Sequence, residues 1–363
     1  MAIAQQVTPR QSSAEIVGGP RDKGAATRGR SAVKVWALIG GALIVFEAIV
    51  LARWISGPYF KQVPAESTPM PGWMQPVLDV WQVAGVVAAA GFICGFVIRP
   101  WRRSGHMTTD GMFVVAFATL WFQDPLSAYF GHWFTYNTHL VNFGSWVKDV
   151  PGWSSFGKPG AMIAEPIVLI GPVYVYFIMT ATLLGCAVMR AAKRRWPALR
   201  PFHLIALCFL LMALVDVVGE GLVWLPLGFW EYPGGIPFLF SGTYHQFPLN
   251  EMLTIAASFT AITSLRYFRI AQDRTVPERD QRVTADDRPR RSWVRLLAVI
   301  GAVHVALVLC YNVPNSIVGT QHLTWPQDLQ QRSYLTDQMC GPGTVNLCPG
   351  NGHGLVEGGR ANP

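Results

Sequence analysis

Charged residues are scarce in this sequence. Asp, Glu, Lys and Arg make up 14% of its 363 residues and hydrophobic residues make up 51%, whereas about a quarter of the residues of a soluble domain are charged. The formal net charge is +8, but Lys and Arg lie between long apolar runs and do not gather in one domain. This segregation disfavours a nucleic-acid-binding protein and indicates a protein that lies in a lipid bilayer.

Sequence motifs of several known chemistries are also missing. The chain has no Gly-rich phosphate loop, no HExxH zinc motif and no GxSxG nucleophile elbow, which disfavours nucleotide-driven and classical hydrolase chemistry. Its six cysteines show no metal-type spacing. No apolar run of membrane length contains a lysine, which argues against a retinal protein. We therefore expect no metal and no cofactor.

Seven stretches are long and apolar enough to cross a bilayer, for which a helix needs about 20 residues. They are residues 35–55, 75–98, 109–130, 166–189, 202–225, 248–265 and 293–311. The third is the weakest, because Gln123, Asp124 and Pro125 interrupt it. The sequence therefore predicts an all-α polytopic membrane protein with about seven transmembrane helices in residues 34–311, a disordered tail in 1–33 and a second tail in 312–363.

The basic residues predict the orientation. With the N-terminus in the cytoplasm, 23 of the 29 Lys and Arg residues fall on the cytoplasmic side, as the positive-inside rule requires. We expect a multi-pass plasma-membrane protein with an extracytoplasmic C-terminus. In that oxidising compartment Cys340 and Cys348 either form a disulfide or remain two free thiols.

Carboxylates are costly inside a membrane, so each is a candidate for function. Asp124 ends the third predicted helix. Asp216 and Glu220 share a face of the fifth helix by their i, i+4 spacing. Glu251 opens the sixth helix, and His245 lies in the loop before it. Most of them fall near the predicted outer face, and Asp216 lies near the middle of its helix. We expect folding to bring them into one basket for general acid and base catalysis.

Other polar residues near this basket are candidates for substrate binding. They are Glu165, Glu231, Tyr232, Tyr244 and Asn142.

Each carboxylate also has an ordinary structural interpretation. Asp110 has the position of an N-cap for the third helix. Glu165 precedes a proline and can simply start a helix, and Glu251 can complement a helix dipole. Asp216 and Glu220 can form an interhelical polar clamp, with Glu47 of the first predicted helix or His304 of the seventh as partner.

Several motifs together resemble the AveC-type spirocyclase family of actinobacterial membrane proteins. They are MTTD at 107–110, WFQDP at 121–125, VNFGSW at 141–146, VPGW at 150–153, WEYPG at 230–234 and YHQFP at 244–248. Asp216 and Glu220 are similar in kind and order. The resemblance implies an enzyme of secondary metabolism that closes a hydrophobic polyketide dihydroxy-ketone into a spiroketal with loss of water. It also implies a second, dehydratase activity and no redox cofactor or metal.

Two other classes of protein fit the same residues. A transporter or receptor for a lipophilic molecule would use the acids to bind protons or a cation. A non-catalytic assembly subunit would use its aromatic outer loops to dock a protein partner, whose identity the sequence leaves open. In the enzyme interpretation the partners are a hydrophobic small-molecule substrate and the bilayer, without nucleic acid.

The predicted orientation has a direct test. A reporter enzyme that works only in the cytoplasm should be active when fused after Arg195 and inactive when fused after Pro363, because the positive-inside rule places these positions on opposite sides. Activity after Pro363 with none after Arg195 would show the opposite orientation.

Overall fold

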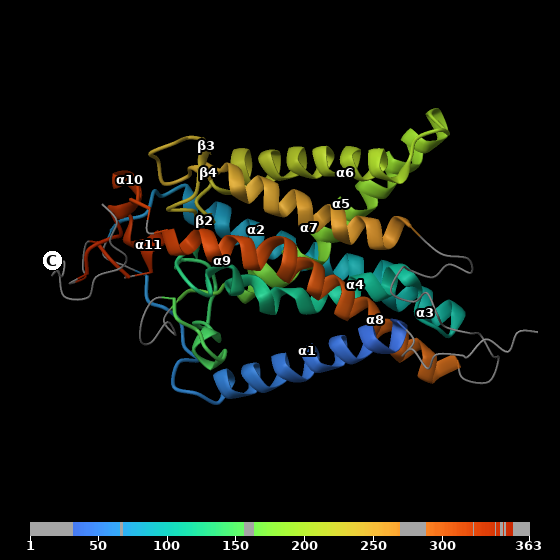
Figure 1. The fold of residues 1–363 in the computed structure, drawn as a ribbon. Coiled ribbons are helices and arrows are strands. Elements are labelled where there is room, and N and C mark those ends of the chain that lie inside the picture. The colour runs from blue at the N-terminus through green and yellow to red at the C-terminus, as the bar shows by residue number, and fades with distance from the viewer. Residues whose placement is uncertain are drawn as a thin grey trace, which may run out of the picture. The chain divides into compact units, whose positions relative to one another are not determined.

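The computed structural model describes residues 32–65, 68–155, 163–268, 288–321, 323–337, 339–341, 344 and 346–350, and these are mostly helical. The predicted tail at 1–33 therefore lies almost wholly outside the described residues. The long helices run side by side (Figure 1). They are α1 (Ala32–Ile55), α2 (Met74–Phe92), α4 (Thr109–Leu120), α5 (Ile167–Arg195), α6 (Pro201–Asp216), α7 (Leu249–Tyr267) and α8 (Arg288–Leu307).

Several of these helices continue in a different helical form. A π-helix extends α2 over Ile93–Ile98, α6 over Val217–Trp224 and α8 over Val308–Asn312. The short helices α3 (Arg99–Ser104) and α9 (Val313–Val318) prolong the first and the last of these. A 3-10 helix over Trp121–Ala128 continues α4.

The prediction of a helical protein is confirmed, and each of the seven predicted stretches contains a helix. Five continuous helices of the described part are long and apolar enough to cross a membrane, over 32–55, 74–104, 167–195, 201–224 and 292–321. α4 is too short, at 12 residues of α-helix. α7 is too polar, because Asn250, Glu251 and Arg266 lie near its ends.

The outer faces of the long helices are apolar. Leu38 on α1, Val80 on α2 and Leu210 on α6 are 67%, 68% and 67% exposed. Water-soluble proteins rarely expose extended apolar patches of this kind. The exposed surface of these helices is therefore compatible with contact with lipid.

The third predicted helix changes form near its predicted interruption. Pro125 has no backbone N–H and its ring crowds an α-helical turn, and the chain from Trp121 follows a tighter 3-10 path. The expected N-cap at Asp110 is wrong, because Thr108 caps α4 by accepting the Gly111 N–H at 3.1 Å. Asp110 instead binds the Arg266 guanidinium.

The seventh helix is longer than predicted. It passes residue 311 and reaches Val318, although this segment contains Asn312, Pro314 and Asn315. Both asparagine side chains find partners inside the protein, since the Asn312 amide donates to Gln123 at 2.9 Å and the Asn315 amide donates to Glu251 at 3.0 Å. Satisfied polar groups can continue a buried helix, so the first residues of the predicted tail are helical.

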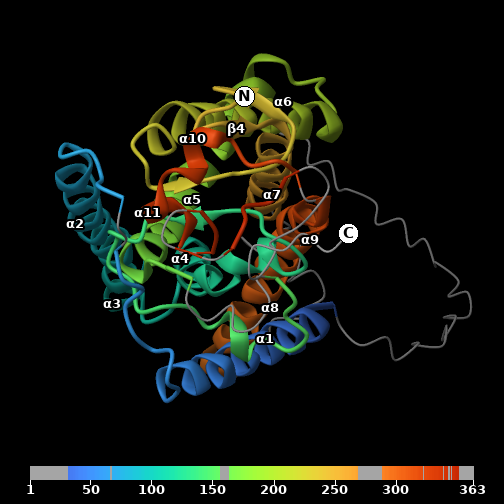
Figure 2. The same ribbon diagram turned by 90° about the vertical axis from the view of Figure 1, so that its left-hand side faces the viewer.

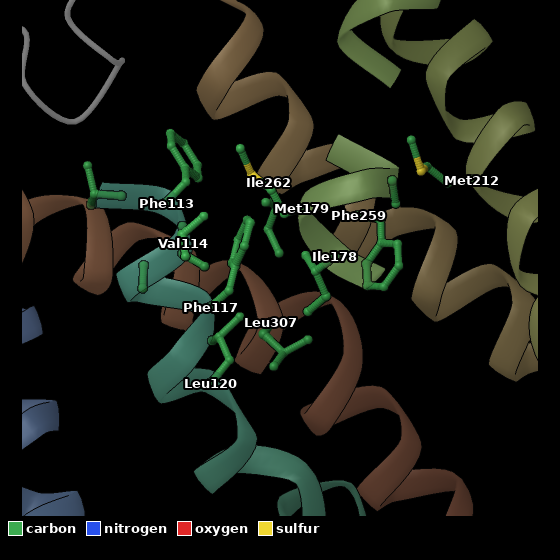
Figure 3. Packing of buried hydrophobic residues seen from close by; sticks show 14 of the residues in the cluster. Phe113, Val114, Phe117, Leu120, Ile178, Met179, Met212, Phe259, Ile262 and Leu307 are labelled. Atoms are coloured by element: carbon green, nitrogen blue, oxygen red, sulfur yellow. The ribbon is translucent and has the colours of Figure 1, made fainter. Parts of the chain in front are cut away.

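The centre of the bundle is apolar and built around α4. Eight of its 12 residues are buried. Phe117 and Leu120 of α4 lie close to Ile178 and Leu307 of the neighbouring helices (Figure 3). Because other helices cover α4 and keep it from lipid, the length of α4 need not match the thickness of a bilayer.

α1 lies against α8, as both ribbon views show (Figures 1 and 2). Its buried residues Val33, Gly40, Glu47 and Trp54 recur every seven positions, which is the spacing of a helix seam. The helices approach closely at Gly40 and Gly301. Glu47 contacts the His304 ring at 3.2 Å, so these two pair with each other.

Short strands and helices gather at one end of the bundle (Figure 1). β1 (Thr135–Tyr136) pairs with β2 (Trp230–Glu231), and β3 (Pro237–Leu239) pairs with β4 (Phe247–Pro248). With α10 (Gln327–Gln330) and α11 (Ser333–Thr336) they form what we call the end layer. Cys340 and Cys348 are joined by a disulfide here, which settles the alternative left open by the sequence.

The glycine contact between α1 and α8 predicts a stability effect. A Cβ at residue 40 would collide with the Leu297 carbonyl oxygen of α8, whereas a Cβ on neighbouring Gly41 would meet only the end of the Leu297 side chain at 4.0 Å. Gly40→Ala should therefore lower the unfolding free energy by about 1–3 kcal/mol, as overpacking does.

The matched control is Gly41→Ala, which should leave stability unchanged or raise it slightly. Both variants are compared by thermal unfolding of the purified protein in detergent. Equal melting temperatures for the two variants would show that the close approach at Gly40 does not hold α1 on α8.

Candidate functional site: an acidic aromatic cavity

A cavity lies between α5, α6, α7 and α8 and below the end layer. Half of the 18 residues that line it are aromatic: Phe134, Tyr136, Tyr174, Phe177, Trp224, Trp230, Tyr232, Phe259 and Tyr311. Asp124, Asp216 and Glu220 also line it. None of these lining residues is Lys, Arg or His, so the cavity combines apolar walls with acidic groups.

Asp124 is held between two phenols. Tyr174 donates its hydroxyl to Oδ1 at 2.8 Å, and Tyr136 donates to Oδ2 at 2.9 Å. Each carboxylate oxygen thus receives one donor. Hydrogen bonds of this kind stabilise the ionised form of a carboxyl group, so Asp124 is suited to act as a base or to stabilise a cation.

Asp216 lies where α6 passes into its π-helical extension. Its side chain is 1% exposed, and Oδ2 has no hydrogen-bond partner among the described residues. A buried carboxylate without partners is costly, which makes Asp216 suited to holding a proton. π-Helical turns are frequent at functional sites, and this one carries Glu220 and Trp224 to the cavity wall.

Glu220 and Glu251 meet at one tyrosine. Tyr232 Oη lies 3.0 Å from Glu220 Oε2 and 2.9 Å from Glu251 Oε1. Glu251 Oε2 accepts the Trp133 indole N–H at 3.2 Å and the Asn315 amide N–H at 3.0 Å. Glu251 does not itself line the cavity, so it lies directly behind the wall that Tyr232 forms.

Glu165 is buried beside the cavity, at 2% exposure, and is not one of its lining residues. Burial raises the pKa of Glu165 well above its usual value, and the nearby Asp124 and Asp337 raise it further. The structure therefore brings Glu165 close to the predicted group without opening it to the cavity.

Glu231 faces away from the cavity. Successive residues of a strand point to opposite faces, and in β2 it is Trp230 that lines the cavity. Glu231 Oε1 lies 3.2 Å from His132 Nε2 and 2.5 Å from Thr135 Oγ1. The predicted substrate contact of Glu231 thus has no support in its placement.

Tyr244 and His245 lie in the end layer, apart from the cavity. The Tyr244 backbone N–H donates to Asp328, and the Arg332 guanidinium lies 4.3 Å from the centre of the Tyr244 ring. The His245 ring packs against Tyr244, and burial lowers its pKa. These contacts fasten the loop before β4 to α10, which is a structural function.

Asn142 also makes structural contacts. Its carbonyl accepts the Val63 N–H at 2.9 Å, and its amide donates to the Leu140 and Thr138 carbonyls. Of the ten predicted site residues, Asp124, Asp216, Glu220 and Tyr232 line the cavity, and Glu251 and Glu165 lie next to it.

The sequence analysis missed several residues of this site. Tyr174 and Tyr311 line the cavity, and Trp133 and Asn315 bind Glu251. The spacing of Tyr311 and Asn315, which is i, i+4 at the end of the last helix, was a usable signal. Among the described residues, no group of three or more His, Cys, Asp or Glu side chains is arranged to hold a metal ion.

Comparison with known proteins relates the chain to a protein family. A protein-family model described as spirocyclase AveC-like matches residues 101–335. No curated protein matches the chain. No solved structure matches it. The matched range contains Asp124, Asp216, Glu220, Tyr232 and Glu251.

The buried pair of His132 and Glu231 predicts a pH dependence of stability. Burial lowers the pKa of His132 to about 3, so the imidazole is neutral in the folded protein at mildly acidic pH. Burial also raises the pKa of Glu231 well above its usual value. An unfolded imidazole binds a proton near pH 6.5. Acidification from pH 6.5 toward 3 therefore favours unfolding, by up to about 1.4 kcal/mol per pH unit from this histidine.

The raised pKa of Glu231 acts in the opposite direction: its contribution is present below its unfolded pKa and is lost as the pH rises through the folded one. His132→Gln keeps an N–H donor for Glu231 and should flatten the loss of melting temperature between pH 6 and 4. His106→Gln, at an exposed histidine, is the control. Identical pH profiles for the His132 variant and the wild type would contradict the assignment.

Proposed function

Because this chain belongs to the spirocyclase AveC-like family, whose model matches residues 101–335, we propose that it is a membrane-embedded cyclase and dehydratase. Its substrate in this proposal is a hydrophobic polyketide-like or lipid-like hydroxy-ketone, which it closes to a spiroketal. The observation that carries the proposal is the cavity in which Asp124, Asp216 and Glu220 face aromatic walls.

The three carboxyl groups have different surroundings, which suits them to different tasks. In our proposal Asp216, which lacks a partner at Oδ2 among the described residues, gives its proton to the hydroxyl of a hemiketal. The C–O bond breaks, water leaves and an oxocarbenium ion forms. A second hydroxyl of the substrate attacks that carbon, and Glu220 takes the proton released from the attacking oxygen.

The walls of the cavity suit the cationic intermediate. In our proposal Asp124, which accepts a hydrogen bond from a phenol at each oxygen, is ionised during the reaction, because a fixed negative charge stabilises a developing cation in a water-poor site. The faces of Trp224, Trp230 and Phe177 add the attraction of aromatic rings for cations. With no basic residue in the lining, nothing opposes this stabilisation.

A transporter or receptor for a lipophilic molecule is the alternative. The same acidic, aromatic lining would bind a lipophilic cation, and the absence of basic residues from it favours this ligand too. The two functions differ in their product: an enzyme changes the covalent structure of its substrate, and a transporter moves an unchanged molecule across the membrane.

The proposal predicts the loss of a chemical product in cavity variants. Lipid extracts are compared by mass spectrometry from cells without the protein, with the wild type, and with Asp216→Asn or Glu220→Gln. A species one water heavier than the wild-type product should accumulate in the first case. In either variant the product should fall by at least about a hundredfold, the usual contribution of a general acid or base.

Asp79→Asn, at an exposed carboxyl on α2 outside the cavity, is the matched control and should retain the product. If every extract contains the same compounds and one of them only changes sides of the membrane, the enzyme proposal fails and the transporter replaces it.

A further inference from the structure

The Tyr232 hydroxyl lies within hydrogen-bonding distance of two carboxyl groups. Its oxygen is 3.0 Å from Glu220 Oε2 and 2.9 Å from Glu251 Oε1. A phenol has one proton and donates one such bond, whereas an ionised carboxylate can only accept. The second contact is therefore a hydrogen bond only if that carboxyl group is protonated and donates to the phenol oxygen.

From this geometry we infer that Glu220 and Glu251 share one proton through Tyr232. The three side chains form a proton relay that connects Glu220 in the cavity lining with Glu251 behind it.

The contacts of Glu251 give the relay its direction. Its Oε2 faces Trp133 Nε1 at 3.2 Å and Asn315 Nδ2 at 3.0 Å. Both nitrogens are donors only, so Oε2 must act as an acceptor. A proton on Glu251 consequently lies on Oε1, which is the oxygen that faces Tyr232.

Two arrangements of the relay follow. In the first, Glu251 is protonated and donates to Tyr232, which donates to an ionised Glu220. In the second, Glu220 is protonated and donates to Tyr232, which donates to an ionised Glu251. The first arrangement becomes the second when Glu251 gives its proton to the Tyr232 oxygen and Tyr232 gives its own proton to Glu220. The number of protons stays the same, and the negative charge moves from Glu220 to Glu251.

The charges around the relay favour one shared proton. Glu251 is fully buried, and no ion pair joins Glu220 or Glu251 to a basic residue within the described part of the chain. The titratable groups that face them are Asp216 from α6, Asp124 from the 3-10 helix after α4, Tyr174 from α5, and Tyr311 from the π-helix after α8. Two neighbouring carboxylates without a cation would repel each other at high cost.

The relay gives Glu251 a task that its position outside the cavity would otherwise leave unexplained. This task rests on the proposed function. While the shared proton lies on Glu251, Glu220 is ionised and can take the proton of the attacking hydroxyl. Asp216, which has given its own proton to the leaving hydroxyl, is then the group that receives this proton from Glu220. Glu251 is thus a positioning residue that acts through Tyr232 and does not touch the substrate.

Infrared spectroscopy of the purified full-length protein in lipid tests the relay without any substrate. Buried protonated carboxyl groups give a separate carbonyl band, whose intensity counts them and whose frequency reports hydrogen bonding. The wild type should exceed the double variant Glu220→Gln/Glu251→Gln by one carboxylic acid. Either other result would overturn the inference. No difference would mean that neither carboxyl group carries a proton, and a difference of two would mean that both do, so that neither could receive one.

Tyr232→Phe provides a second reading that does not depend on the double variant. It removes the linking hydroxyl and should shift the carbonyl band of the carboxyl group that carries the shared proton, since this group loses its hydrogen-bond acceptor. Tyr136→Phe is the matched control, because Tyr136 binds only Asp124 among the carboxyl groups, and it should leave that band in place. An unchanged spectrum in Tyr232→Phe would overturn the relay.

These spectra separate the two claims. A shared proton with no covalent product in the lipid extracts would leave the relay standing and remove the cyclase. A product formed by a protein whose spectrum lacks the shared proton would leave the cyclase standing and remove the relay.

Discussion

The absence of basic side chains from the lining of the cavity constrains every other group there. Carboxyl groups that cannot pair with a cation must be stabilised by neutral donors or must keep their protons. The protein supplies tyrosine hydroxyls for this purpose: two bind Asp124, and one lies between Glu220 and Glu251. The carboxyl groups of the cavity are therefore accompanied by hydroxyl groups and not by cations.

Three departures from α-helical form lie at the cavity. The 3-10 helix at Trp121–Ala128 and the π-helices at Val217–Trp224 and Val308–Asn312 each contribute a residue that lines the cavity. Altered helical turns rotate the following side chains relative to a regular helix. Each of these three departures thus lies where a polar or aromatic side chain lines the cavity.

Local pattern in the sequence was enough to predict the helices and part of the site. Apolar runs identified the stretches that form helices, and the i, i+4 spacing of Asp216 and Glu220 placed both on the cavity side. Their partners come from far along the chain: Tyr174 is 50 residues from Asp124, and Trp133 is 118 residues from Glu251. No local periodicity reports such contacts, and neither did it report the direction of Glu231, which depends on a strand of two residues.

The end layer is held together by the last segment of the described chain. The Leu335 carbonyl binds Thr135 and the Tyr334 carbonyl binds Thr138, on either side of Tyr136 in the cavity wall. Tyr311 and Asn315 also come from this late part of the sequence. During synthesis the ribosome must therefore pass residue 335 before the cavity can acquire all of its walls. In shorter nascent chains the carboxyl groups of the cavity are already present, but Tyr311 and Asn315 are not yet there to accompany them.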